Sequence, residues 1–166
     1  MRAGDVQGAD VSDPDAMVPM VVGGGMIPGA VGYAVCCAFA RRSVALVIPR
    51  CGVFAAIRAL DHNRAVELPA GKVGDGESAY DAAVREGEEE LGVPVAVRVV
   101  PLGEFLHRFG GEWWCCTAFL GDLEGAHPRG GPEGEAVWAT REELCASTYG
   151  ETTARVFAAY DKRCAE

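Results

Sequence analysis

Three glutamates, Glu86, Glu89 and Glu90, lie within one helical turn near the middle of this 166-residue chain. Carboxylates so close together suit a hard divalent cation, because Mg²⁺ prefers oxygen ligands and is usually held by a few carboxylates, waters and substrate phosphates. Without a cation, like charges at positions i and i+4, here Glu86 and Glu90, destabilise a helix. The same grouping also occurs on ordinary solvated helix faces, so the neighbouring residues decide between the two interpretations.

The acids belong to a segment with clear start and stop signals for a helix. Ser78 can cap a backbone N–H at its start, and Asp81 stands at the capping-box spacing. Gly92 suits the left-handed conformation just past the last turn, and Pro94 prevents continuation. A helix between Ser78 and Gly92 is therefore predicted, preceded by a glycine-rich loop that begins at Gly71.

Helical phase, at about 100° per residue, divides this segment into two faces. The apolar arc consists of Tyr80, Val84, Gly87 and Leu91. The second arc holds the three glutamates, with Ala79, Ala82 and Ala83 among them. We therefore expect one face to pack against the core, while the other presents carboxylates separated only by small methyl groups.

The stretch Gly71–Val93 resembles the Nudix box, which reads glycine, five residues, glutamate, seven residues, Arg-Glu, an aliphatic residue, any residue, Glu-Glu, any residue, glycine and an aliphatic residue. The positions in register are Gly71, Glu77, Arg85, Glu86, Glu89, Glu90, Gly92 and Val93. The departure is Gly87, where the family usually has a larger aliphatic residue. A glycine costs about 1 kcal/mol in a helix interior, so Gly87 predicts a weaker buried face and unaltered chemistry.

The resemblance implies a Mg²⁺-dependent enzyme, with Mn²⁺ as the other suitable cation, and it implies roles for the box residues. Glu86, Glu89 and Glu90 resemble the metal ligands and catalytic acids, with Glu90 or Glu89 nearest the attacking water. The backbone carbonyl of Ala70 or Gly71 is the further metal ligand that the resemblance suggests.

Two more box residues, Glu77 and Arg85, resemble a structural ion pair that holds the loop on the helix. The alternative for Arg85 is a surface ion pair with Asp81 or Glu89, and such a pair contributes little to stability.

The general base of this family is either a box glutamate or an acid on a distant loop. Glu133 and Glu135 precede Trp138 in a way that resembles such a loop, although each also suits a solvated position. We take Glu133 as the catalytic candidate ahead of Glu135.

Outside the box, three residues are candidates for substrate binding. Arg58 could bind a phosphate, and Trp113 and Trp114 offer rings for a base, although alternation along a strand gives at most one of them to a ligand. The sequence Glu67-Leu68-Pro69-Ala70-Gly71 resembles the box entrance of hydrolases that act on ADP-ribose and related nucleotide sugars. Many nucleoside-triphosphate members instead have a second glycine at position 70.

Composition is that of a globular protein, with 49% hydrophobic and 23% charged residues. The net charge of −9 repels nucleic acid backbones and disfavours a general nucleic-acid binder. It is compatible with a small phosphate ester that binds through a divalent cation. No apolar run approaches the roughly 18 residues of a membrane span, and the N-terminus lacks a signal-peptide pattern.

The cysteines are odd in number and include no C-x-x-C pair and no zinc-like spacing with histidine. They are Cys36, Cys37, Cys51, Cys115, Cys116, Cys145 and Cys164. We predict that they are small buried side chains in a reducing compartment, which indicates a cytoplasmic location.

We expect residues 1–30 to form a flexible N-terminal segment and residues 31–166 to form a single domain. The predicted strands are Val31–Ala40, Ser43–Pro49, Val53–Leu60, Val95–Leu102, Trp113–Leu120 and Glu135–Ala139. Arg41-Arg42 is predicted as a turn, Phe105–Glu112 as a loop or strand end, and Gly121–Gly134 as a long loop. A helix beginning after Thr140 and a final helix over about Glu151–Arg163 complete the pattern.

This order of elements predicts an α+β fold, an α/β/α sandwich with a mixed β-sheet between helices, and the resemblance implies the same. Some relatives exchange N-terminal strands in a homodimer, and Val31–Ala40 could take that part. The predicted activity is a pyrophosphohydrolase acting on a nucleoside diphosphate linked to another group, with ADP-ribose or a nucleotide sugar preferred. The alternatives are hydrolysis of (d)NTPs or dinucleoside polyphosphates, a non-catalytic nucleotide-binding module, and mRNA decapping.

Overall fold

The computed structural model describes residues 20–22, 25–27, 40–60 and 65–165. The chain divides into two compact units, Met1–Ala40 and Arg41–Glu166. In the first unit, β1 (Met20–Val22) and β2 (Gly25–Ile27) form an antiparallel pair. The predicted strand Val31–Ala40 and the predicted boundary after residue 30 lie outside the described residues, apart from Ala40, which is a bend.

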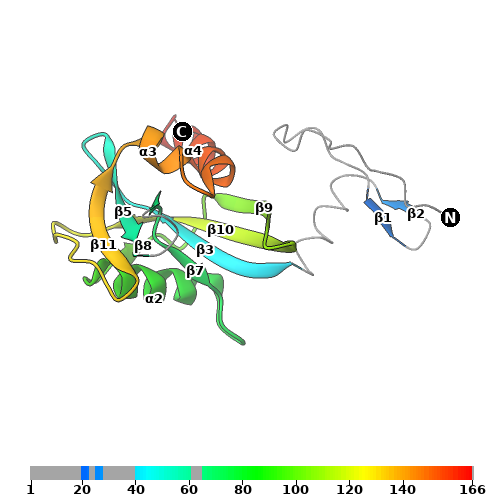
Figure 1. Ribbon diagram of the computed structural model, residues 1–166, viewed down its shortest axis with the longest axis horizontal. Helices are drawn as coiled ribbons and strands as arrows, with labels where there is room; N and C mark the ends of the chain where they lie inside the picture. Colours follow the sequence, from blue (N-terminus) through cyan, green and yellow to red (C-terminus); the bar gives the residue numbers. More distant parts are fainter. Residues whose placement is uncertain (1–19, 23–24, 28–39, 61–64, 166) are drawn as a thin grey trace. The chain divides into compact units, whose positions relative to one another are not determined.

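The described strands of the second unit form two sheets, shown in Figure 1. The five-stranded sheet has the order β7 (Ala70–Lys72), β3 (Arg41–Val47), β10 (Glu112–Asp122) and β8 (Ala96–Val97), with β9 (Gly103–Phe109) also on β10. The four-stranded sheet has the order β11 (Gly134–Ala139), β5 (Val53–Ala59) and β4 (Pro49–Arg50), with β6 (Val66–Glu67) also on β5. Because β3 and β10 are parallel while the other pairs are antiparallel, the larger sheet is mixed, as predicted.

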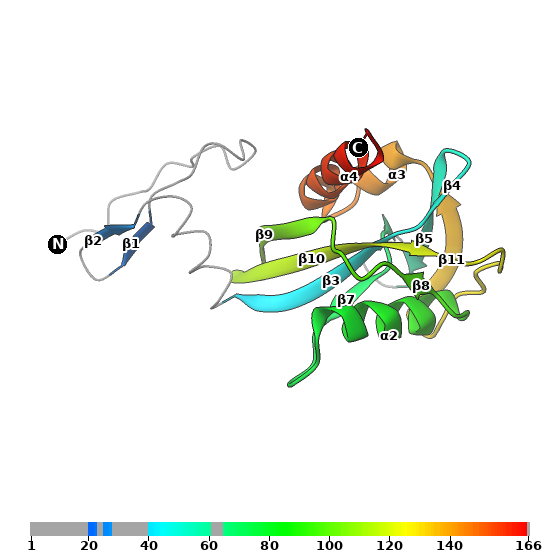
Figure 2. The ribbon, with the colours of Figure 1, turned by 180° about the vertical axis from the view of Figure 1, so that it is seen from behind.

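Helices cover both sides of the larger sheet: α2 (Ala79–Leu91) lies on one side, and α3 (Arg141–Cys145) and α4 (Gly150–Ala165) lie on the other (Figures 1 and 2). Alternate residues of β3 therefore enter different cores. Val44 and Leu46 pack in the cluster that contains Leu91 of α2, whereas Val47 packs with Phe157 of α4. This arrangement confirms the α+β class. Within the described part of the chain, no helix is both long and apolar enough to cross a membrane.

The hairpin β9–β10 corrects the prediction of a loop or strand end at Phe105–Glu112. β9 pairs with β10 along its whole length, from Gly103 opposite Ala118 to Phe109 opposite Glu112. Gly110 and Gly111 both have positive φ angles, of 58° and 83°, and make the turn. A Gly-Gly pair between two strand-forming runs is a hairpin signal, and the prediction overlooked it.

Two further segments differ from their predictions. Arg41-Arg42 is not a turn but the start of β3, where the two arginines stand opposite Trp114 and Cys115. Val95–Leu102 forms a strand only at Ala96–Val97, because Pro101 and the exposed valines before it belong to a loop. The hairpin predicted around Cys51 is present as β4–β5, and the strand predicted at Glu135–Ala139 is β11.

Two arginines of α4 bind backbone carbonyls of β9 and of the segment just before it. Arg155 Nη1 donates to the carbonyl of Leu106 at 2.9 Å, and Arg163 Nη2 donates to the carbonyl of Pro101 at 3.2 Å. Among the described strands, β9 is hydrogen-bonded to β10 alone, so Arg155 covers part of its other edge.

The caps of α2 agree with the sequence, but its buried face is wider than the predicted arc. Ser78 Oγ accepts the N–H of Asp81 at 3.0 Å, and Gly92 is left-handed with φ of 66°. Ala82 and Ala83 are completely buried, so they belong to the packing face and do not stand among exposed acids. The prediction placed them wrongly because the helix is covered by parts of both sheets, which bury more than one narrow stripe.

Gly87 allows α2 to approach β3 closely and does not weaken the buried face. A Cβ at this position would lie 2.6 Å from Leu46 Cδ1 and 3.2 Å from Val95 Cγ2. The side chains of Leu46 and Val95 therefore fill the volume that a larger aliphatic residue would need.

We expect Gly87→Val to lower the free energy of unfolding by about 1–3 kcal/mol, because added methyl groups overpack this contact. Urea denaturation measures the loss. Leu46→Ala alone should also destabilise the protein, but it makes room for the valine at position 87. The double variant should therefore lose less free energy of unfolding than the two single variants added together. Additive losses would show that Gly87 and Leu46 do not compete for the same volume.

Candidate functional site

Glu90 is a carboxylate inside the protein, with only 8% of the residue exposed. Its Oε2 accepts the backbone N–H of Ala70 at 2.9 Å, which joins α2 to β7. Burial, and after it the negative charges of Glu86, Glu133 and Glu67, raise the pKa of this carboxyl to about 8. A site that holds a carboxylate in this environment is suited to a positively charged ligand.

Glu86 lies against the first glycine of the box. Its side chain is 14% exposed, and burial raises its pKa although Arg85 acts in the opposite direction. The carboxylate of Glu86 occupies the space where a Cβ on Gly71 would stand. The glycine therefore forms a cradle for the acid, and it brings the backbone of β7 beside Glu86 and Glu90.

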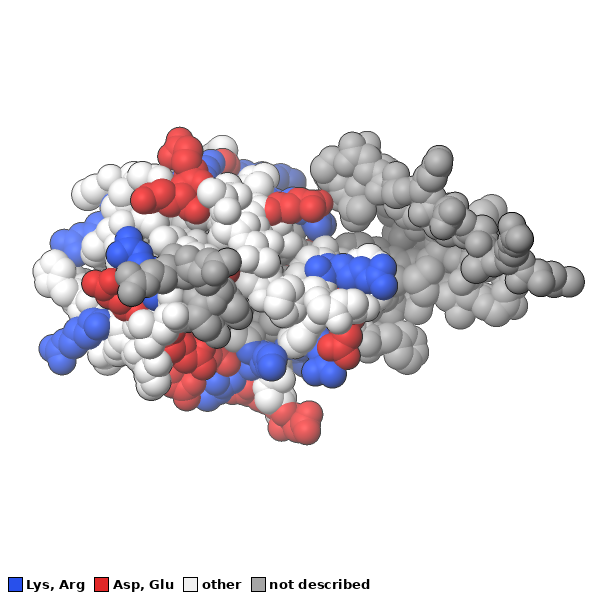
Figure 3. All heavy atoms as spheres, in the orientation of Figure 1, with Lys and Arg blue, Asp and Glu red and all other residues white. Residues whose placement is uncertain are grey.

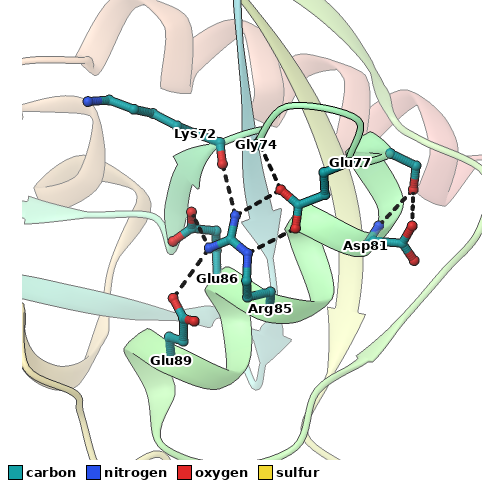
Figure 4. Close-up of polar contacts among 8 residues, drawn as sticks. Lys72, Gly74, Glu77, Asp81, Arg85, Glu86 and Glu89 are labelled. Atoms are coloured by element: carbon teal, nitrogen blue, oxygen red, sulfur yellow. Dashed lines mark hydrogen bonds and ion pairs between the residues drawn. The ribbon is translucent and has the colours of Figure 1, made fainter.

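Arg85 connects the glycine loop to the acidic face of α2 (Figure 4). Its guanidinium forms two bonds to Glu77, Nε to Oε1 at 2.9 Å and Nη2 to Oε2 at 3.0 Å, and Nη2 also donates to the carbonyl of Lys72 at 3.0 Å. On the other side, Nη1 contacts Glu86 at 2.8 Å and Glu89 at 3.3 Å. Asp81 is not a partner of Arg85, because its carboxylate accepts the hydroxyl of Ser78.

The acidic face fits a hard divalent cation by the chemistry of its donors. Glu86, Glu89 and Glu90 offer carboxylates, and the backbone of Gly71 lies against the carboxylate of Glu86. In the described part of the chain, no three carboxylate, imidazole or thiol side chains converge as a ready metal site, and Arg85 already bonds two of these acids. Burial is the main cause of the raised pKa of Glu86 and of Glu90, and the charges of neighbouring glutamates add to it, a repulsion that a bound cation would relieve.

A cavity of about 550 Å³ opens beside these residues. Gly71 and Glu90 line it at one place, together with Glu133 from the loop before β11 and Glu67 from β6. Much of its remaining wall is apolar or aromatic, including Leu60, His107, Phe109, Trp114, Tyr149 and Val156. Acids at one place and aromatic rings elsewhere are typical of a site for a small polar ligand with a ring system.

The model of the NUDIX domain family matches residues 39–160, which is most of the chain and includes the acidic helix and its loop. The protein belongs to the Nudix family. It is therefore a hydrolase that acts on phosphoanhydride bonds.

Solved structures of Nudix proteins share its fold. A NUDIX hydrolase from Nitrosomonas europaea aligns with a TM-score of 0.62 and 23% identity, over 74% of this chain and 89% of that chain. The Ap4A hydrolase of C. elegans aligns with a TM-score of 0.59 and 20% identity, over 72% and 96% of the two chains. A MutT NUDIX hydrolase from Burkholderia pseudomallei has 28% identity and a TM-score of 0.53, over 63% and 85%. No curated protein sequence matches the chain.

Of the acids predicted outside the Nudix box, the structure brings Glu133 to the cavity but not Glu135. Glu135 forms an ion pair with Arg58 at 3.5 Å instead. Arg58 itself does not line the cavity, because Ile57 and Ala59 point inward from β5 and the residue between them points outward.

The two tryptophans separate as strand alternation requires. Trp114 is buried and lines the cavity, whereas Trp113 is 46% exposed and does not. Trp114 is therefore the tryptophan that a substrate of this Nudix hydrolase could contact, and Trp113 is not placed at the site.

Several lining residues of this Nudix hydrolase were missed from the sequence. His107 and Phe109 belong to β9, and alternation would have placed them on one face if the Gly-Gly turn had been recognised. Lys72 directly follows the first box glycine, and Tyr149 directly precedes α4. Nothing local in the sequence marks Tyr149, since the fold of the whole chain brings α4 to the cavity.

The Glu77–Arg85 ion pair predicts that the free energy of unfolding decreases at acid pH. Hydrogen bonds from Arg85, then from the N–H of Gly74, lower the pKa of Glu77 from 4.5 to about 2. A lowered pKa stabilises the folded state above the ordinary pKa, and this stabilisation disappears as the pH falls through the folded value. We expect the free energy of unfolding to decline as the pH falls from about 4.5 to about 2, and Glu77→Gln to flatten that decline. Urea denaturation at a series of pH values measures it.

Glu88→Gln is the matched control, because Glu88 is exposed on the same helix. Its free energy of unfolding should decline with falling pH as steeply as that of the wild type. An equally steep decline in Glu77→Gln would show that the ion pair does not govern stability at acid pH.

Proposed function

We propose that this Nudix hydrolase, with Mg²⁺ or Mn²⁺ bound, cleaves a phosphoanhydride bond in a nucleoside diphosphate linked to another group. The observation that carries the proposal is that Gly71 and Glu90 of the box line a cavity of about 550 Å³. The products would be a nucleoside monophosphate and a second phosphorylated compound.

In this proposal, Glu86, Glu89, Glu90 and the carbonyl of Gly71 hold the cation. A bound divalent cation polarises phosphoryl oxygens and makes a coordinated water more acidic. Arg85 fixes the glycine loop and the glutamates relative to each other, so positioning and electrostatics provide most of the catalysis.

Glu133 is the candidate general base, because it lines the same cavity as Glu90 and raises the pKa of both Glu86 and Glu90 by its charge. In this role it would accept the proton of the attacking water. The aromatic wall would receive the nucleoside: the ring centroids of Phe109 and Tyr149 are 5.2 Å apart, and a base can stack against such side chains.

The other functions considered for the sequence are less well supported. A non-catalytic nucleotide-binding module does not need all three box glutamates, which this chain retains. Removal of an mRNA cap requires a path for RNA, which a net charge of −9 disfavours. We also propose a cytoplasmic location, since Cys115 and Cys116 are buried and form no disulfide, although Cys51 and Cys164 are exposed, contrary to the prediction. A homodimer is a proposal from the family alone.

The test is to incubate the full chain with Mg²⁺ or Mn²⁺ and a panel of ADP-ribose, nucleotide sugars, (d)NTPs, dinucleoside polyphosphates and capped RNA. Mass spectrometry of products formed in ¹⁸O-water identifies the bond cleaved and the phosphorus attacked. We expect nucleoside monophosphate from at least one small substrate and none after chelation of the metal. A folded protein without turnover on the whole panel would refute the proposal, and tight binding without products would favour the non-catalytic module.

A further inference from the structure

A second hollow of about 530 Å³ lies next to the cavity of the proposed active site. The two spaces share Lys72 and Trp114 as lining residues. The second hollow is otherwise formed by Arg41 and Arg42 at the start of β3 and by the glycine loop over residues 73–77. The two spaces are therefore adjacent at Lys72 and Trp114.

Trp114 holds two cations at the junction between the spaces. The guanidinium carbon of Arg41 lies 5.6 Å from the centroid of the Trp114 ring system, and Nζ of Lys72 lies 5.9 Å from it. Arg41 stands directly opposite Trp114 in the parallel pair β3–β10, and Lys72 comes from β7 on the other side of β3. Cations within about 6 Å of a tryptophan ring are attracted by its electrons, so a buried ring orients both groups.

Three basic side chains, those of Arg41, Arg42 and Lys72, line this hollow against two acids, Asp75 and Glu77. Among the described residues, neither Lys72 nor Arg42 has a carboxylate within ion-pair distance, and Glu77 on the hollow's wall is bound to Arg85. Arg41 pairs with Glu112 at 2.9 Å, but both side chains are more than half exposed, so the pair contributes little. Figure 3 shows acidic and basic side chains interspersed on the visible face, so three basic groups around one hollow stand out in a chain with net charge −9.

Lys72 is placed to reach a phosphate beside the box acids. It directly follows Gly71, and its carbonyl accepts from Arg85 while its side chain extends away from the arginine (Figure 4). The backbone carbonyl of Lys72 is thus bound by Arg85, which also binds the glutamates, whereas Lys72 also lines the neighbouring hollow.

We propose that Lys72 and Arg41, oriented by Trp114, bind a phosphate group beyond the bond that is cleaved. The inference rests on the proposed function and narrows its substrate class to compounds with three or more linked phosphates, namely nucleoside triphosphates or dinucleoside polyphosphates. It therefore reverses the preference for ADP-ribose that the residues before the box suggested, because the second half of ADP-ribose carries a neutral sugar at that distance.

The test compares kcat/KM for diadenosine tetraphosphate with kcat/KM for ADP-ribose. We expect the wild type to prefer the tetraphosphate, and Lys72→Gln and Arg41→Gln each to lower the ratio of the two values about tenfold, since a charge-assisted bond to phosphate is lost. Trp114→Phe removes no charge, but a phenylalanine ring attracts cations less strongly than tryptophan, so this variant should lower the ratio as well. Arg98→Gln, an exposed arginine outside both hollows, is the control and should leave the ratio unchanged.

Each outcome bears on one proposal separately. Turnover with an unchanged ratio in the Lys72 and Arg41 variants overturns the phosphate subsite and leaves the proposed function standing. If no substrate is turned over, the proposed function fails, and the subsite is then judged by calorimetry with inorganic tripolyphosphate in the presence of Mg²⁺. Equal affinity of wild type and Lys72→Gln for tripolyphosphate would overturn the subsite in that case as well.

Discussion

Glu90→Gln should reduce kcat by about 10²-fold or more and leave the fold intact. Glutamine has the size of glutamate, and its carbonyl oxygen can still accept the N–H of Ala70 that Glu90 binds at 2.9 Å. It lacks the negative charge that would hold a cation beside Gly71. Steady-state kinetics on the best substrate of the panel measures the loss, and circular dichroism checks the fold. Near-full activity would remove Glu90 from the metal site.

The same substitution should stabilise the metal-free protein. Burial raises the pKa of Glu90 from 4.5 to about 8, so its ionised form disfavours folding, and stability declines as the pH rises through that range. Glutamine abolishes this penalty, which is on the order of 3 kcal/mol at pH 7. We expect Glu90→Gln to unfold at higher urea concentration than the wild type at pH 7, and the difference to vanish near pH 4.5.

Added Mg²⁺ should reverse this order, because a cation bound by the acids stabilises the wild type more than the variant. Glu88→Gln, on the exposed side of the same helix, should show neither the activity loss nor the gain in stability. A Glu90→Gln variant with the stability profile of the wild type would show that the buried carboxylate carries no such penalty.

Gly71→Ala should lower kcat/KM about 10- to 100-fold, the size of effect expected when the orientation of a metal ligand is disturbed. The added methyl group takes the place of the Glu86 carboxylate, so Glu86 must turn away from Glu90. The effect should appear as weaker activation by Mg²⁺, measured by titrating the metal at saturating substrate. Wild-type metal dependence in this variant would mean that Glu86 has room to move without cost.

A double-mutant cycle separates this cause from a general disturbance of β7. If Gly71→Ala acts through Glu86, then adding it to Glu86→Ala should cost almost nothing further, because the methyl group fills space that the shorter side chain has left. Multiplied losses in the double variant would place the effect of Gly71→Ala elsewhere in the strand.

The parts of the structure that sequence predicted are those controlled by neighbouring residues. Ser78 and Gly92 bound α2 because capping needs only a hydroxyl and a glycine at the right spacing. Thr140 and Glu143 likewise form a complete capping box at α3. The strands β5, β10 and β11 followed from apolar runs between turn residues.

The rest depended on contacts between distant residues. The spacing of the glutamates could not show that Glu90 is buried while Glu89 is 60% exposed at its side chain, since that difference comes from β7 and the loop of Glu133. Nor could it show that Gly87 is required by Leu46, a residue of another strand. Arg58 and Trp113 were plausible ligands by residue type alone. Their side chains lie on the faces of β5 and β10 that point away from the cavity, which their types could not show.

The arginines of α4 have a consequence for the order in which the protein is made. β9 is translated before Arg155 and Arg163, so these two side chains can bind the carbonyls of Leu106 and Pro101 only after α4 has been made. An open strand edge invites pairing with another chain. The interval between translation of residue 109 and residue 163 is therefore the period when chaperones would be needed most, and premature stop codons in α4 should send the product into inclusion bodies.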